Sequence, residues 1–271
     1  MESLETRRQR FHQLHASGCF VMPNPWDIGS ARALAGLGFK ALATTSAGFA
    51  WSIGRRDNGV SLEDVLDHLR AMAGAVDVPL NADFEGGFAI EPEGVAANVA
   101  RAVATGIAGI SIEDSNGNAA DPLFELSLAV ERIRAARRAI DASNTGVLLT
   151  GRSEGFIVGR PDLASTMARL AAYAEAGADC LYAPGIKSMT DVTAIIKAVA
   201  PKPVNVLVHM PFATVAQLAD AGVRRISVGG ALARVAWSGF LEAAQEIATS
   251  GTFERFGGMR PRTEIEALFV S

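Results

Sequence analysis

Asp162-Leu-Ala-Ser-Thr-Met-Ala-Arg-Leu170 begins a helical stretch directly after Pro161, and the stretch ends at Gly177, before the apolar run Cys180–Ala183. Alanine and leucine recur on one face of the stretch, which predicts an amphipathic helix. A proline before the first turn and a glycine after the last turn are typical helix boundaries. This part of the sequence therefore predicts one helix that leads into one buried strand.

The same unit recurs along the whole chain, with a short apolar run about every 30 residues followed by an alanine-rich helical stretch. The eight predicted strands are Cys19–Met22, Ala41–Thr45, Val78–Asp83, Gly109–Glu113, Val147–Gly151, Cys180–Ala183, Pro203–Val208 and Arg225–Gly229. Strands joined by helices run parallel and are buried on both faces. We therefore expect an α/β protein, a (β/α)8 TIM-type barrel over residues 1–250 that forms the catalytic domain. Residues 251–271 are expected to form a helical tail that packs on the barrel or on a neighbouring subunit.

The composition is that of an ordinary globular protein, with 271 residues, 49% of them hydrophobic and 20% charged. The net charge is −4 and the arginines are scattered, so a nucleic-acid partner is not expected. No apolar run approaches the roughly 18 residues of a membrane helix, which favours a cytoplasmic protein without a membrane partner. Cys19 and Cys180 lie in separate apolar runs, which predicts free thiols in a reduced compartment.

Carboxylates follow two neighbouring strands, at the end of the barrel where enzymes of this fold build their sites. Asp83 and Glu85 follow the third predicted strand, and Glu113 and Asp114 follow the fourth. Like charges brought together repel one another unless a cation or proton lies between them. Oxygen ligands favour Mg²⁺ or Mn²⁺ over zinc. The alternative is that these carboxylates cap helices or pair with arginines.

Arg152 closes the fifth predicted strand and faces the same mouth, where its planar guanidinium suits a substrate carboxylate or phosphonate. An anionic substrate follows from this interpretation, whereas an ion pair with Glu154 or Glu113 is the structural alternative. Small residues from Thr45 to Gly48 could present consecutive backbone N–H groups to an anion, or form only a turn.

Lysine and histidine chemistry is limited in this sequence. The lysines lie outside the inner ends of the predicted strands, which argues against Schiff-base catalysis; they are Lys40, Lys187, Lys197 and Lys202. Of the four histidines, His209 alone follows a strand end, where it is a candidate acid or base or a loop hydrogen bonder. The Gly229–Gly230 pair precedes a helix, a position where barrels bind phosphate.

Ordered motifs at the strand ends carry a resemblance to a known superfamily. They are Asn24-Pro-Trp-Asp27, Thr45-Ser-Ala-Gly48 with Gly54-Arg-Arg-Asp57, Asn81-Ala-Asp-Phe-Glu-Gly-Gly87, Gly109-Ile-Ser-Ile-Glu-Asp114, Gly151-Arg-Ser-Glu154 and Pro203-Val-Asn205. From about Asn24 to Gly239 the chain resembles the phosphoenolpyruvate mutase and isocitrate lyase superfamily. Its members bind a small 2-oxo acid on Mg²⁺ and make or break the bond next to an enolate.

The resemblance implies roles for individual residues. Asp83 and Glu113 fall on the metal-binding carboxylates, and Glu85 is an additional candidate ligand. Asp57 lies near the metal as nucleophile or water-positioning group. Backbone groups of Ser46, Ala47 and Gly48 hold the substrate anion together with Arg152, and the matching motifs add Trp26 and Asn205 as substrate-binding residues. The usual tetramer of the superfamily, with exchanged C-terminal helices, would account for the tail.

The sequence departs from the superfamily pattern at three places. Asn81 replaces the first aspartate of an Asp-x-Asp motif, so Glu85 compensates or metal affinity is weak. The loop of residues 115–124 lacks the Lys-Lys-Cys-Gly-His of the lyases, and Pro184 replaces their glutamate. Cleavage of isocitrate or methylisocitrate by the superfamily route is therefore not expected. Asn116 to Asn118, around Gly117, would form a lid over the site or a static crossover.

The leading hypothesis is a Mg²⁺-dependent enzyme acting on an oxaloacetate- or phosphonopyruvate-like 2-oxo acid, as a decarboxylase, hydrolase or phosphonomutase and as a homo-oligomer. Its catalytic candidates are Asp57, Asn116, Arg152 and His209. One alternative is a carbon-carbon lyase of a methylisocitrate-like acid that uses a non-cysteine base, either His209 or a loop residue. The other is a barrel that binds a metabolite without catalysis.

Overall fold

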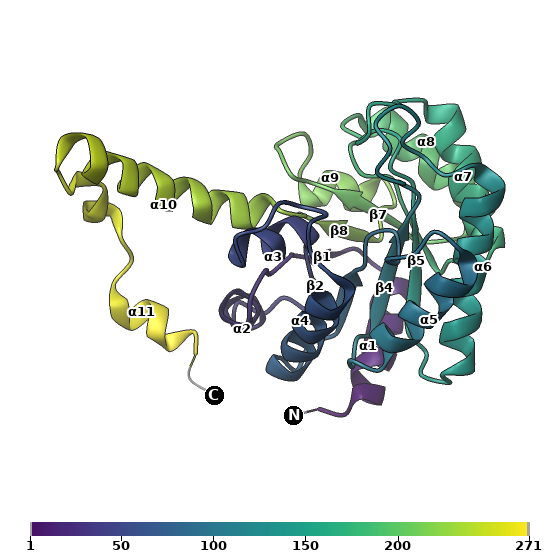
Figure 1. Cartoon of the computed structure of the whole chain (residues 1–271), viewed down its shortest axis with the longest axis horizontal. Coiled ribbons are helices and arrows are strands. Elements are labelled where there is room, and N and C mark those ends of the chain that lie inside the picture. The colour runs from purple at the N-terminus through teal and green to yellow at the C-terminus, as the bar shows by residue number, and fades with distance from the viewer. Residues whose placement is uncertain (1, 270–271) are drawn as a thin grey trace.

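Eight parallel strands form a barrel in the computed structural model, which describes residues 2–269 (Figure 1). The strands are β1 (Phe20–Met22), β2 (Leu42–Ala43), β3 (Leu80–Asp83), β4 (Gly109–Glu113), β5 (Leu148–Arg152), β6 (Cys180–Tyr182), β7 (Val204–Leu207) and β8 (Arg225–Ser227). They pair in the order β1-β8-β7-β6-β5-β4-β3-β2. The Ala43 amide donates to the Pro23 carbonyl at 3.1 Å and links β2 to the end of β1. The expected (β/α)8 barrel is therefore confirmed.

Each of the eight predicted runs contains a strand, and the ends differ from the prediction by up to two residues. The second run shows the physical reason. Thr45 was expected inside that strand, but its hydroxyl accepts a hydrogen bond from the Gly48 amide and caps the next helix. A capping residue leaves the strand ladder because its side chain satisfies a free helix N–H group.

Helices cover the outside of the barrel and extend beyond it. They are α1 (Leu4–Ala16), α2 (Ile28–Gly36), α3 (Ser46–Ser52), α4 (Leu62–Ala75), α5 (Pro92–Val103), α6 (Leu126–Ala142), α7 (Leu163–Glu175), α8 (Met189–Val199), α9 (Val215–Asp220), α10 (Ala231–Ser250), the 3₁₀ turn η1 (Glu254–Gly258) and α11 (Arg262–Ala267). Gly106, Gly177 and Gly222 follow helix ends with φ of +96°, +105° and +92°. The φ of Gly177 confirms the glycine terminator that the sequence indicated, and Gly106 and Gly222 end two further helices in the same way.

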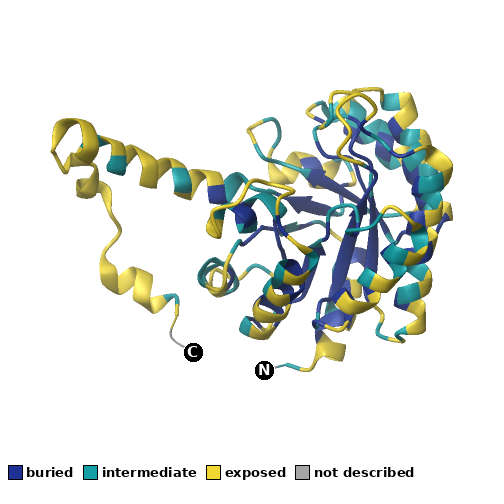
Figure 2. Cartoon of the chain, in the orientation of Figure 1, coloured by how far each residue is buried: buried dark blue, intermediate teal, exposed yellow. Residues whose placement is uncertain are grey.

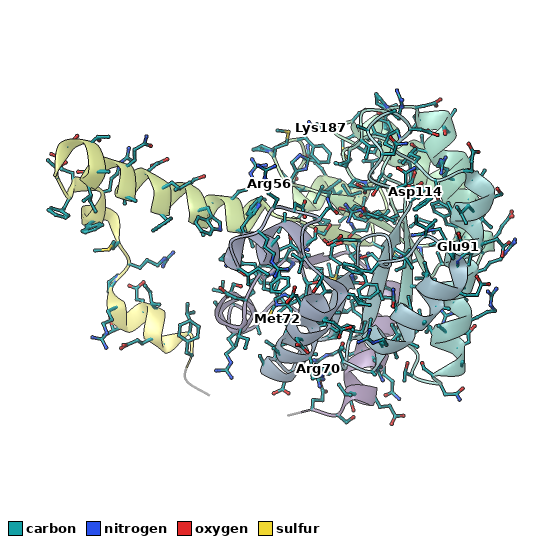
Figure 3. The ribbon with its side chains drawn as sticks, viewed as in Figure 1. Arg56, Arg70, Met72, Glu91, Asp114 and Lys187 are labelled. Atoms are coloured by element: carbon teal, nitrogen blue, oxygen red, sulfur yellow. The ribbon has the colours of Figure 1, made fainter. Side chains whose placement is uncertain are left out.

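The apolar core has two parts. A large cluster lies between the strands and their helices, and a smaller one that includes Phe11, Phe20, Met22 and Leu148 fills the end of the barrel next to α1. Because α1 closes that end, the barrel opens at the carboxyl ends of its strands. Figure 3 shows Asp114 and Lys187 at the open end, whereas Arg70 lies near the closed one.

α10 and the segments after it project away from the barrel (Figures 1 and 2). Large apolar side chains on α10 are exposed, including Val235 at 71% and Phe240 at 59%. The Glu246 carboxylate on α10 accepts hydrogen bonds from the backbone amides of Glu254 and Arg255, so η1 folds back on α10. Val270 and Ser271 of the expected tail lie outside the described residues. No helix in residues 2–269 combines the length and apolar character needed to cross a membrane.

Candidate active site

A cavity of about 150 Å³ lies inside the open end of the barrel. Six of the predicted site residues line it, namely Ser46, Ala47, Asp57, Asp83, Arg152 and Asn205. They come from β3, β5, β7 and the loop and helix after β2. The structure thus brings together at the barrel mouth residues that lie up to 159 positions apart in the chain, 205 minus 46.

Arg152 lies among three carboxylates. Its Nη1 is 3.1 Å from Asp83 Oδ1 and 3.2 Å from Glu113 Oε2, and its Nε is 2.5 Å from Glu154 Oε1. The Tyr182 ring lies below the guanidinium, with 5.3 Å between Cζ and the ring centroid. Within residues 2–269 Nη2 has no acceptor. One edge of a rigid guanidinium in the cavity wall is therefore free to bind an anion.

The positive charge of Arg152 compensates the negative charges of the three carboxylates. The sequence left this open as the structural alternative for Arg152, an ion pair with Glu154 or Glu113. Burial raises the pKa of Glu113 to about 8, while Arg152 opposes that shift and Glu154 and Asp83 add to it. Burial also raises the pKa of Glu154, again against the pull of Arg152. The Ser115 hydroxyl donates to Glu113 Oε1 at 2.5 Å. A metal ion is thus not required to hold Asp83 and Glu113 together.

Oxygen atoms on the side of the cavity next to α3 form a set that suits a divalent ion. The Asp83 Oδ2 accepts from the Ser46 amide at 3.0 Å. Burial raises the pKa of Asp57, which the Ser46 hydroxyl lowers and the nearby Asp83 carboxylate raises further. The buried Asn81 Oδ1 has no hydrogen-bond partner among residues 2–269, but it lies against Gly109 and Phe11 and not on the α3 side. No group of three or more His, Cys, Asp or Glu within that range is arranged as a metal site, and the set on this side consists of the two carboxylates of Asp57 and Asp83.

The predicted anion-binding turn is the first turn of the short helix α3. The Ser46 amide already binds Asp83, and the Gly48 amide already binds the Thr45 hydroxyl at 3.4 Å. Gly48 packs against Trp26, since a Cβ at Gly48 would lie 2.8 Å from the Trp26 Cβ. Of the three residues expected to hold the substrate anion through backbone groups, Ala47 alone keeps its amide without an acceptor in the described chain.

Three other predicted residues, Glu85, Glu113 and Asn116, line a neighbouring cavity of about 740 Å³. Burial and repulsion from Asp83 and Asp57 raise the pKa of Glu85 to about 7, and its backbone is left-handed with φ of +47°. Both ends of the Asn116 side-chain amide bond within its own loop, to the Asp121 carbonyl at 2.8 Å and the Asn118 amide at 2.8 Å. These bonds use the Asn116 side chain to shape the loop.

Trp26 and His209 lie outside the mouth cavity. Trp26 lines an apolar groove of about 330 Å³ beside α10, together with Trp237 and Phe240. His209 is half-buried, and its pKa is lowered by burial and by Lys187 and Arg234. Asp114, which the sequence grouped with Glu113, faces α7, where the Tyr173 hydroxyl donates to it at 2.6 Å.

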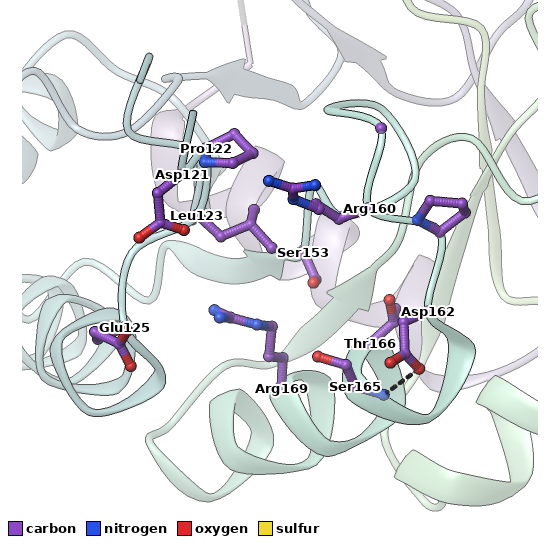
Figure 4. Close-up of a pocket in the computed structure, with 13 residues that line it drawn as sticks. Asp121, Pro122, Leu123, Glu125, Ser153, Arg160, Asp162, Ser165, Thr166 and Arg169 are labelled. Carbon is purple, nitrogen blue, oxygen red and sulfur yellow. Dashed lines mark hydrogen bonds between the residues drawn. The ribbon is translucent and has the colours of Figure 1, made fainter. Parts of the chain in front are cut away.

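A further cavity of about 470 Å³ opens beside α7 (Figure 4). Figure 4 shows Arg169 reaching it from α7 and Arg160 from the preceding loop. Arg169 is engaged by Asp114 at 3.2 Å and by the Phe124 carbonyl at 3.0 Å. None of the predicted site residues lines this cavity.

Several cavity residues were missed from the sequence, among them Tyr182 and Arg225. The predicted site residues lie near the ends of the predicted strands and in the loops after them, whereas Tyr182 lies inside its predicted strand and Arg225 begins one. Alternate residues of a strand face the same side. Since Arg152 faces the barrel interior and pairs in register with Tyr182, the alternation could have placed Tyr182 in the interior.

Residues 11–248 match the family model of phosphoenolpyruvate phosphomutase. A Mycobacterium tuberculosis H37Rv protein of uncharacterised function is 32% identical over 263 residues, 96% of each chain. The oxaloacetate decarboxylase of Bradyrhizobium diazoefficiens is 27% identical over 72% of this chain and 69% of that enzyme. A crystal structure from Burkholderia cenocepacia J2315, described provisionally as a lyase/mutase, has a TM-score of 0.95 and 43% identity, covering 100% of this chain and 98% of that one.

Proposed function

We propose an enzymatic activity for this chain, which belongs to the phosphoenolpyruvate phosphomutase family. Its relatives and structural neighbours are lyases, mutases and hydrolases. The chain is a Mg²⁺-dependent enzyme that makes or breaks the C–C or P–C bond next to the enolate of a small 2-oxo acid. One observation carries this proposal. The unpaired Nη2 of Arg152 and the oxygens of Asp57 and Asp83 line the same small cavity.

The residues present fit a magnesium ion. Mg²⁺ keeps several waters and needs one or two protein carboxylates, with substrate oxygens completing its shell. Asp57 and Asp83 would hold the ion, with substrate oxygens and waters completing its shell. Glu85 and Glu113, which the sequence also assigned to the metal, line the neighbouring cavity and would act from further out. When bound, the ion stabilises negative charge on the enolate oxygen.

The side chains around the cavity divide the remaining tasks. Nη2 of Arg152 binds the anionic group of the substrate, and the Tyr182 ring keeps the guanidinium plane in place. Asp57, beside the ion, orients a water at the bond being broken. The small, half-enclosed cavity limits water around the enolate.

A turnover screen tests this function. The protein is mixed with Mg²⁺ and, in turn, oxaloacetate, phosphonopyruvate and 2-methylisocitrate, and the formation of pyruvate, phosphoenolpyruvate and oxalate is followed against a control without enzyme. We expect turnover of one of the first two acids and its loss in Arg152→Ala. Activity that survives Arg152→Ala would refute the role of Arg152, and unchanged Mg²⁺ dependence in Asp83→Ala would remove Asp83 from the metal site. Binding without product from any acid would favour a metabolite-binding barrel.

We also propose that the projecting arm, residues 231–269, packs on a second copy of the chain. Its exposed apolar side chains include Val235, Phe240 and Leu241, and the apolar groove beside Trp26 lies at its base. Monomeric proteins rarely expose apolar surface of this extent. A closed homo-oligomer would bury the arm, and sedimentation of Phe240→Asp, with Ile90→Asp as control, tests this.

A further inference from the structure

Arg225 is a buried arginine inside the barrel, below the mouth. It is the first residue of β8, is 2% exposed and lines the same cavity as Arg152. Its Nε donates to Asn205 Oδ1 at 2.9 Å, its Nη2 to Thr150 Oγ1 at 3.0 Å, and its Nη1 lies 3.3 Å from His15 Nε2. Three of the five guanidinium N–H groups are therefore used, and two remain.

All three partners of Arg225 are neutral. Asn205 and Thr150 carry no charge, and burial together with the Arg225 charge lowers the pKa of His15 to about 3. The His15 Nδ1 lies 2.8 Å from the Phe11 carbonyl and donates to it, so the lone pair on Nε2 accepts from Arg225. The imidazole thus binds the guanidinium without compensating its charge.

The two arginines of the cavity differ sharply in charge compensation. Arg152 contacts three carboxylates, whereas no Asp or Glu in residues 2–269 forms an ion pair with Arg225. A buried charge is costly unless an opposite charge or a full set of hydrogen bonds offsets it. Since Arg225 faces the cavity with two unused N–H groups, the missing negative charge belongs in the cavity.

We propose that Arg225 forms a second anion-binding site at the floor of the cavity and selects, among small 2-oxo acids, those that carry a second oxyanion group. One group binds Nη2 of Arg152 and the other, a carboxylate or phosphonate, binds Arg225. This inference rests on the proposed function and assigns the second oxyanion group of an oxaloacetate- or phosphonopyruvate-like substrate to Arg225. A monoanionic acid such as 2-oxobutyrate would leave one buried arginine without a counter-charge.

Calorimetric titration of the full chain with Mg²⁺ tests the proposal. The probes are 3,3-difluorooxaloacetate, which has two carboxylates and no hydrogen at C3, phosphonopyruvate, and 2-oxobutyrate, which has one carboxylate. Arg225→Met removes the cation. Thr150→Asp places a carboxylate beside Arg225 and supplies an internal counter-charge, and Thr150→Asn is its matched control of the same shape without charge.

We expect wild-type protein to bind a dianionic probe more tightly than 2-oxobutyrate. Arg225→Met and Thr150→Asp should each weaken the binding of the dianionic probe by about 10- to 100-fold. Both variants should leave 2-oxobutyrate affinity nearly unchanged, and Thr150→Asn and Arg225→Lys should keep the preference. Which dianionic probe depends on Arg225 identifies the second group as carboxylate or phosphonate. If Arg225→Met fails to fold, the comparison of Thr150→Asp with Thr150→Asn decides alone.

Two results would overturn the inference while leaving the proposed function intact. One is an equal loss of all probes in the variants, which would make Arg225 a structural residue. The other is chloride binding that depends on Arg225 while the dianionic probes are unaffected, which would assign the floor to an inorganic ion. Failure of wild-type protein to bind any probe would instead refute the proposed function.

Discussion

Replacing Arg152 with methionine removes the cation that three carboxylates share at the barrel mouth. The Arg152 side chain is 17% exposed, and Glu113 and Glu154 are 8% and 4% exposed, so the ion cluster is largely shielded from water. Breaking a buried ion pair by removing one partner typically costs about 3–5 kcal/mol, because uncompensated charge is left behind. We expect Arg152→Met to lose that much free energy of unfolding at pH 8.5.

The loss should shrink at low pH, and the sign follows from Glu113. Its pKa is raised to about 8 in the folded protein, so the folded state binds more protons than the unfolded chain between about pH 4.5 and 8. Stability from this group is therefore present at low pH and lost as the pH rises through the folded pKa. Without Arg152 the folded pKa rises further, and each added unit costs about 1.4 kcal/mol at pH values above it. At pH 5.5 Glu113 is protonated in the folded state of both proteins, so the higher pKa in the variant causes no additional loss of stability.

Urea unfolding at fixed protein concentration, at pH 5.5 and 8.5 and in EDTA, measures both quantities. Arg152→Lys is the matched control, because it keeps the positive charge and loses the planar fork, and it should lose less stability than Arg152→Met at pH 8.5. A loss below about 1 kcal/mol at pH 8.5 would mean that the cluster is solvated like a surface pair. If Arg152→Met lost the same free energy of unfolding at both pH values, the carboxylates would not be taking up protons to replace the charge of Arg152.

Three further substitutions test other parts of the structure. Glu85→Gln should match wild type near pH 5 and be more stable by about 1–3 kcal/mol at pH 8, because stability from Glu85 is lost as pH rises through its folded pKa of about 7; thermal melting in EDTA checks this. Tyr173→Phe removes the hydrogen bond to Asp114 and should cost about 1.5–3 kcal/mol in urea unfolding, and a cost near zero would contradict its burial. Phe240→Asp should weaken self-association at least about 10-fold in sedimentation experiments, whereas Ile90→Asp, at an equally exposed site off the arm, should not; equal behaviour would count against the arm interface.

The fold could be predicted from the sequence because its signals are local and repeated. Every strand lies in an apolar run, and Gly177 ends its helix in the left-handed conformation, as its place after the last turn indicated. The helix α3 was not anticipated, since Thr45 to Gly48 contains a glycine and small residues that suit a turn equally well. The hydrogen bond from the Gly48 amide to the Thr45 hydroxyl caps these residues as a helix instead of a simple turn, and this bond is visible only in the structure.

The candidate site was predicted less completely, because it depends on which way side chains point after a strand ends. Arg152, Asp83 and Asp57 were placed at the mouth, and they line it. Glu85 follows Asp83 by two residues, but a left-handed backbone at position 85 and the tight turn after it direct Glu85 to the neighbouring cavity. Such a backbone change leaves no periodic signal in the sequence. The roles of these residues stay predictions until the variants above are measured.

Repulsion between carboxylates predicted a positive charge at the barrel mouth, but it could not predict whether a metal ion or an arginine supplies that charge. Repulsion requires a positive charge near Asp83 and Glu113, and a guanidinium meets that requirement as well as a metal ion does. The informative feature is the opposite one, a positive charge at Arg225 whose partners are all neutral. A cluster that is already balanced can hold a residue in place, whereas an unbalanced buried charge points to something that binds. The floor of the cavity is therefore where ligand selectivity should be sought first.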